Sequence, residues 1–132
     1  MADAIDIYGT AFKNGSATLL ARIVGQNGAD IVRADLSAVR YTVYLLDDQD
    51  PDGRTAVANH SDAALSVAQV IFDSTQIDPL WTVDEIGYNF RHVLDVTPHP
   101  AFSIAGRNYL VEYQLTPMAG QVILVRFRLN VI

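Results

Sequence analysis

The fold is decided by residues 108–131, NYLVEYQLTPMAGQVILVRFRLNV. Apolar side chains fill every second position on both sides of a central link: Tyr109, Val111, Tyr113, Leu115, then Ile123, Val125, Phe127, Leu129 and Val131. Such alternation predicts half-buried strands, with one face in the core and the other in water. The link at 116–120 contains the Pro and Gly that turns prefer. The stretch therefore predicts a β-hairpin.

The same period of two recurs upstream. Residues 17–23, 39–45 and 88–96 each alternate, and the turn sequence Asn27-Gly28 follows the first of them. We expect another short strand and turn at 29–37. The middle is less regular, with strand pieces expected at 65–67 and 70–72 and a helical turn at 73–80.

These segments define the fold class. About seven or eight short strands, with at most one short helical turn and no helical crossovers, predict an all-β sandwich of two antiparallel sheets. The length of 132 residues, without an internal repeat or a linker, predicts a single domain over residues 1–132.

Composition excludes several classes of function. The chain has no cysteine, which excludes a disulfide scaffold and Cys-based metal sites. A net charge of -6 makes nucleic acid an unfavourable partner. No apolar run approaches the roughly 20 residues that span a bilayer, and the start MADAID is acidic. We therefore expect no membrane partner and no secretion signal, which leaves both virion and cytoplasm open as locations.

The choice of charged residues is unusual. Lys13 is the only lysine among nine cations, and Glu85 and Glu112 are the only glutamates among fifteen acids. Lysine and glutamate are depleted at protein interfaces, whereas arginine is enriched there. The bias indicates much surface in contact with other protein, and codon usage in a GC-rich genome is the alternative explanation.

An acidic run offers the one candidate metal site. Asp48, Asp50 and Asp52 alternate before Gly53, and alternating carboxylates at a turn can supply hard oxygen ligands to Ca²⁺. An EF-hand is excluded, because the twelfth position is Asn59 rather than Glu. The alternatives that remain are a looser Ca²⁺ turn and an acidic hairpin loop without a metal.

The sequence predicts neither catalytic residues nor a bound cofactor. His60, His92 and His99 match no zinc spacing, and His92 lies on the apolar face of its strand, which favours a hydrogen-bonded core histidine. No Gly-x-Ser-x-Gly motif and no phosphate-binding loop occurs. Trp81, with Tyr88 and Phe90, is either a plug at the end of the sandwich or a platform for stacking sugars.

Residues 105–113, AGRNYLVEY, resemble the penultimate strand of an immunoglobulin-like sandwich. That resemblance implies that the Tyr109 hydroxyl bonds back to the preceding loop. Together with ATLLAR at 17–22 and ADLSAV at 34–39, the layout resembles the N-terminal immunoglobulin-like module of phage baseplate upper proteins. It is also similar to small structural proteins of prophage tail or capsid gene clusters. The resemblance implies a structural part of a virion or injection device, and not an enzyme.

We therefore expect a structural interaction module of a phage or phage-like assembly. Its partners would be copies of itself, in a homo-oligomer, and other structural proteins of the assembly. The outward positions of the predicted strands supply the candidate interface residues, which are Arg22, Arg40, Tyr44, Arg91, Arg126 and Arg128. The alternative function is a carbohydrate-binding or Ca²⁺-dependent binding module that uses Trp81 and the acidic run.

Overall fold

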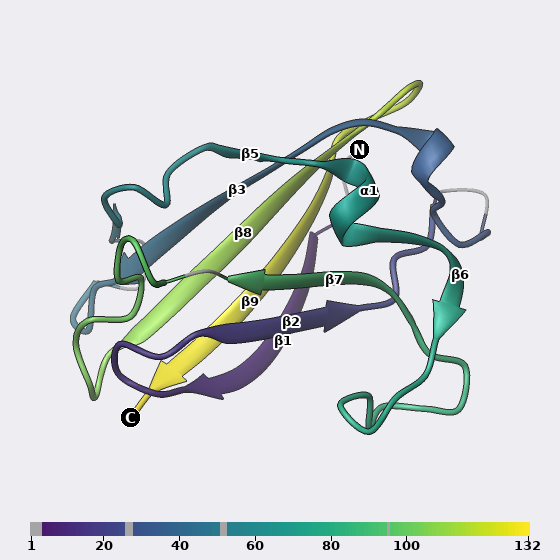
Figure 1. The fold of residues 1–132 in the computed structure, drawn as a ribbon. Helices are drawn as coiled ribbons and strands as arrows, with labels where there is room; N and C mark the ends of the chain where they lie inside the picture. The colour runs from purple at the N-terminus through teal and green to yellow at the C-terminus, as the bar shows by residue number, and fades with distance from the viewer. Residues whose placement is uncertain (1–3, 26–27, 51–52, 95) are drawn as a thin grey trace.

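Two β-sheets packed face to face make up the fold (Figure 1). The computed structural model describes residues 4–25, 28–50, 53–94 and 96–132. Helical structure in these ranges is limited to the 3-10 turn η1 (Arg33–Asp35) and the single turn α1 (Val67–Val70). The strands there are β1 (Ala4–Ala11), β2 (Ala17–Ala21), β3 (Leu36–Leu46), β4 (Arg54–Ala56), β5 (Ala63–Leu65), β6 (Ile71–Gln76), β7 (Tyr88–Leu94), β8 (Asn108–Pro117) and β9 (Ile123–Val131).

The strand order is that of an immunoglobulin-like sandwich. The larger sheet has the order β1-β9-β8-β3-β4, with β5 also paired to β3, and the smaller sheet has the order β2-β7-β6. In immunoglobulin domains the second, fifth and fourth strands share one sheet, and the third, sixth and seventh share the other. Here β2, β7 and β6 correspond to the second, fifth and fourth immunoglobulin strands and share the smaller sheet. Strands β3, β8 and β9 correspond to the third, sixth and seventh and share the larger sheet. The predicted all-β sandwich is confirmed.

One strand pair departs from the expected antiparallel arrangement. β1 pairs in parallel with β9, from Ala4 opposite Leu124 to Ala11 opposite Val131. The two strands lie at opposite ends of the chain, and a parallel pair has no tight turn to reveal it in the sequence. With β1, the described ranges contain nine strands, where the sequence predicts about seven or eight.

Three local predictions are wrong. The strand piece expected at 65–67 is not formed as predicted, because β5 ends at Leu65 and Val67 begins α1. The helical turn expected at 73–80 is absent, because β6 continues to Gln76, which pairs with Tyr88 of β7. The short strand expected at 29–37 is reduced to a bridge between Val24 and Asp30, followed by η1. The Asp35 carboxylate accepts a hydrogen bond from the Val32 amide at 3.0 Å, and this local bond favours the turn.

The predicted C-terminal hairpin is confirmed. β8 and β9 pair from Asn108 opposite Asn130 to Leu115 opposite Ile123. At the start of β8, the buried Tyr109 hydroxyl accepts a hydrogen bond from the Ile104 amide at 3.2 Å. This is the bond to the preceding loop that the resemblance implies, and it is the tyrosine corner of immunoglobulin-like domains.

Aromatic rings join the two sheets at the centre of the core. Phe90 of β7 meets Tyr113 of β8 edge-on at 4.8 Å between ring centroids and stacks on Phe127 of β9 at 6.2 Å. All three rings are buried. Paired aromatic rings contribute more than their buried area alone, so this cluster fixes how β7 of the smaller sheet packs on the larger sheet.

Candidate functional site

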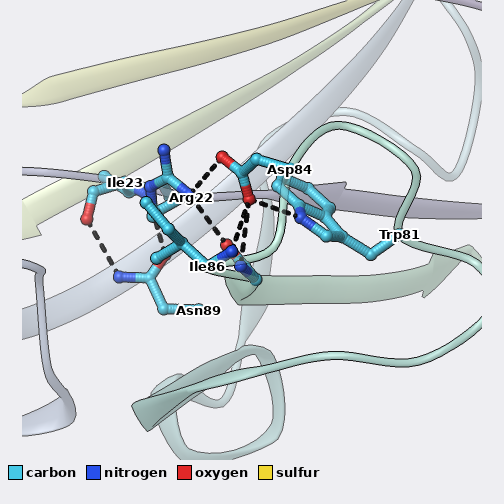
Figure 2. Close-up of polar contacts among 7 residues, drawn as sticks. Arg22, Ile23, Trp81, Asp84, Ile86 and Asn89 are labelled. Atoms are coloured by element: carbon cyan, nitrogen blue, oxygen red, sulfur yellow. Dashed lines mark hydrogen bonds and ion pairs between the residues drawn. The ribbon is translucent and has the colours of Figure 1, made fainter.

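A loop between β6 and β7, residues 77–87, is held in place by an aspartate at its centre. We call it the pinned loop. The Asp84 carboxylate accepts hydrogen bonds from Trp81 Nε1 at 2.9 Å, from the Ile86 amide at 3.0 Å and from the Gly87 amide at 3.1 Å. Its other oxygen lies 2.6 Å from the guanidinium of Arg22, which follows β2 (Figure 2). The bonds from Trp81, Gly87 and Arg22 hold the pKa of Asp84 far below its usual value.

Both ends of the pinned loop are also fixed. Near its start, Asp78 accepts a hydrogen bond from the Tyr88 hydroxyl at 2.5 Å, which lowers the pKa of Asp78 and raises that of Tyr88. At its end, Gly87 has a φ of +107°, and a Cβ there would clash with the Gln76 carbonyl oxygen. Only glycine fits that position. The loop therefore has one defined path at both ends.

A buried asparagine continues this network into the smaller sheet. The Asn89 side chain exchanges two hydrogen bonds with the backbone of Ile23, at 2.7 and 2.9 Å, and donates a third to the Ile31 carbonyl at 2.9 Å. Figure 2 shows the bonds to Ile23 beside those of Asp84. Asn89 thus extends the pairing of β2 and β7 beyond the last residue of β2.

The pinned loop turns apolar side chains toward solvent. Leu80 is 61% exposed and Val83 is 73% exposed, and Ile77 and Ile86 are exposed as well. Clustered large aliphatic groups on a soluble surface usually mark an interaction site. Because hydrogen bonds fix the backbone that carries them, these groups are presented in one arrangement.

Beside the pinned loop runs an apolar groove between β1 and β2, which belong to different sheets. We call it the β1–β2 groove. It encloses about 460 Å³, and its floor reaches the core side chains Leu19, Phe127 and Leu129. Tyr8, 75% exposed, and Phe12, 70% exposed, line it from β1 and the segment that follows. Leu80, Trp81 and Val83 line it from the pinned loop.

Of the two alternatives for Trp81, the aromatic platform does not form. Tyr88 and Phe90 are buried, so they cannot stack on a sugar together with Trp81. Trp81 is half-buried and packs on Tyr88, with 5.8 Å between ring centroids, as expected of a plug at one end of the sandwich.

The predicted interface residues divide between the outer faces of the two sheets. Arg40 and Tyr44 of β3, and Arg126 and Arg128 of β9, belong to the larger sheet, whereas Arg91 of β7 belongs to the smaller one and Arg22 follows β2. Most of them have partners within the chain. Arg126 pairs with Glu112 at 3.1 Å, Arg40 with Asp62 at 3.4 Å, and the Arg54 guanidinium covers the Tyr44 ring at 4.3 Å. They form no single patch.

The structure describes only part of the acidic run. Asp48 and Asp50 lie in the exposed connection after β3, and Asp48 forms an ion pair with Arg107 at 3.0 Å. Asp52 lies outside the described residues. No group of three or more potential metal-ligating side chains gathers in the ranges that the structure describes.

Two tyrosine–histidine pairs lie between the sheets. His92 Nδ1 lies 2.5 Å from the Tyr113 hydroxyl, so His92 is the hydrogen-bonded core histidine that its strand position predicts. Burial, and then the nearby His60, lower the pKa of His92 to about 4. His60, a buried loop residue, donates from Nε2 to the His99 carbonyl at 2.8 Å, and its Nδ1 accepts from the Tyr41 hydroxyl at 2.8 Å. The sequence does not predict this second pair.

Comparison with family models, with characterised proteins and with solved structures found no match for this chain. In the described ranges, no helix has the length and apolar character needed to cross a membrane.

Proposed function

We propose that this protein is a non-enzymatic structural module that works by self-association and by docking onto other structural proteins, in a phage or phage-like tail, baseplate or capsid. One observation carries the self-association part. The pinned loop and the β1–β2 groove form a continuous apolar surface, with Tyr8, Phe12, Leu80 and Val83 all more than half exposed. An apolar surface of this kind is unfavourable in a protein that stays alone in water.

The assignment to a phage-like assembly has a separate basis. It rests on the resemblance of residues 17–22, 34–39 and 105–113 to baseplate modules, and the tyrosine corner at Tyr109 agrees with the immunoglobulin-like part of that resemblance. The carbohydrate-binding alternative has less support, because Tyr88 and Phe90 are buried.

Light scattering coupled to size-exclusion chromatography tests the self-association. We expect a mass that rises above 14.5 kDa as the concentration increases through the micromolar range. The same measurement at high salt separates apolar contacts, which persist, from exposed ion pairs, which weaken. A monomer at every concentration and salt would overturn self-association. The genes that flank this one test the second part, since tail or capsid genes are expected there.

A further inference from the structure

The smaller sheet ends on an uncovered strand. In the described residues β2 pairs with β7 on one side only. The backbone amide and carbonyl of Ile23 bond to Asn89, on the side of β2 that faces β7. Successive residues of a strand point these groups to alternate sides, so those of Thr18 and Leu20 point away from β7. Unpaired backbone groups on an edge strand are a template for another strand. The edge of β2 is therefore available for pairing.

The opposite edge of the smaller sheet, at β6, is covered. At β6, the Arg33 side chain donates from Nε to the Ile71 carbonyl at 2.7 Å, and the Arg33 amide donates to Asp73 at 2.9 Å. Thus η1 covers that edge. The sequence of β2, ATLLA, has no charge and no proline, which are the usual protections of an exposed edge.

Resting on the self-association proposed above, we propose that β2 pairs antiparallel with β2 of a second copy, and that the surface around the β1–β2 groove is the contact between the copies. A contact across a two-fold axis uses the same patch on both copies, so that patch must be self-complementary. The exposed side chains Phe12, Leu80 and Val83 line the groove, so in a two-fold contact apolar groups of one copy would meet apolar groups of the other.

The register follows from which backbone groups point outward. Placing Leu19 opposite its equivalent in the partner sets Thr18 of each copy opposite Leu20 of the other. All the outward amides and carbonyls of the strand are then used, whereas a shift of one residue would leave some of them unpaired. The pairing would join two three-stranded sheets into one of six strands.

Charge complementarity favours a second copy as the occupant. Lys13 is exposed just before β2, and Glu85 is exposed in the pinned loop next to Asp84, which pairs with Arg22 just after β2. Antiparallel pairing brings the start of one β2 near the end of the other. Lys13 of each copy would therefore face Glu85 of its partner, and opposite charges meet twice.

Four variants are compared with the wild-type full chain, and dimer dissociation is measured by analytical ultracentrifugation. Val83→Lys should raise the dissociation constant at least about tenfold, because it places a charge in the apolar contact. Met118→Lys is the matched control, since Met118 is 71% exposed and does not line the groove, and it should change the constant less than about twofold. Glu85→Lys should weaken the dimer, and Lys13→Glu combined with Glu85→Lys should restore it.

Amide hydrogen exchange tests the strand pairing itself. Exchange at Thr18 and Leu20 should slow at concentrations where the dimer forms and should return to the monomer rate in Val83→Lys. Fluorescence of Trp81, the only tryptophan, should shift to the blue on association, because it lines the groove. Circular dichroism should show that each variant stays folded.

The outcomes separate the two proposals. A wild-type protein that is monomeric throughout overturns both. A wild-type oligomer that Val83→Lys leaves intact, or whose Thr18 and Leu20 amides exchange as fast as in the monomer, overturns the β2 pairing and leaves self-association through another surface.

Discussion

Lowering the pH from about 7 to about 4.5 should destabilise the sandwich through His92. In the folded protein, burial and the neighbouring His60 lower the pKa of His92 to about 4, against an ordinary value of 6.5. Between these two values the unfolded chain takes up a proton at His92 and the folded protein does not. Acid therefore favours the unfolded state, and the stability present above pH 6.5 is lost as the pH falls toward 4.

The size of the effect follows from the two pKa values. They differ by about 2.5, and each pKa unit corresponds to about 1.4 kcal/mol, so about 2 to 3 kcal/mol should be lost by about pH 4.5. The groups that face His92 are the Tyr113 hydroxyl, the Tyr41 ring and His60. None of them is a carboxylate, whose negative charge would stabilise the protonated imidazole ring of His92.

Urea unfolding between about pH 7.5 and pH 4.5 measures this loss. His92→Gln removes the titrating ring and keeps an acceptor for Tyr113, so its free energy of unfolding should depend on pH less steeply than that of the wild type. His99→Gln is the matched control, because the His99 side chain is exposed and its carbonyl still accepts from His60. If His92→Gln loses stability with acid as steeply as the wild type, His92 is not the group that titrates.

Four further perturbations test the core, the tyrosine corner, the pinned loop and the acidic run. Phe127→Ala should cost ~3 to 5 kcal/mol in urea unfolding, because it empties a buried aromatic position, and a loss under about 1 kcal/mol would contradict that position. Tyr109→Phe should cost about 1 kcal/mol through loss of the bond from the Ile104 amide, and an unchanged stability would show that the corner bond contributes nothing. At a dilution where the protein is monomeric, Asp84→Asn should speed cleavage by chymotrypsin in the pinned loop, whereas Glu85→Gln, which changes an exposed carboxylate in the same loop, should not. Equal rates would show that Asp84 does not hold the loop. Low-millimolar Ca²⁺ should move the melting temperature by no more than about one degree, because a short acidic turn without a bidentate Glu offers few fixed ligands, and a rise of several degrees would support a Ca²⁺ site.

The alternation of residues was sufficient to predict the sandwich, because the side-chain period of a strand is local. Tyr113 and Phe127 point into the core as their positions predict. β1 was not predicted, since its only strand partner in the described chain, β9, lies more than a hundred residues away. Pairing across that distance leaves no local pattern in the sequence.

The candidate site was harder to predict for a different reason. Asp78 and Asp84 resemble ordinary turn residues in the sequence, and their role depends on Tyr88 and Arg22, which the fold brings to them. Trp81 stood out as the only tryptophan, but its contact with Asp84 could not be derived from spacing alone. The interface residues were chosen because they occupy outward positions of alternating strands. Such alternation shows that a residue faces outward, but it does not show which outward residues lie together in one patch.

The parallel pairing of β1 with β9 has a consequence for synthesis on the ribosome. β1 is synthesised before the other described strands, and its partner, Ile123–Val131, is synthesised after them. Bringing β1 and β9 together closes the whole chain between them into a loop, which costs conformational entropy. Contacts between residues so far apart in the sequence also slow folding. Until β9 emerges, β1 has no strand to pair with in the described chain, and Ile7, which packs against the core in the folded protein, remains uncovered. Completion of the larger sheet therefore waits until β9 has left the ribosome.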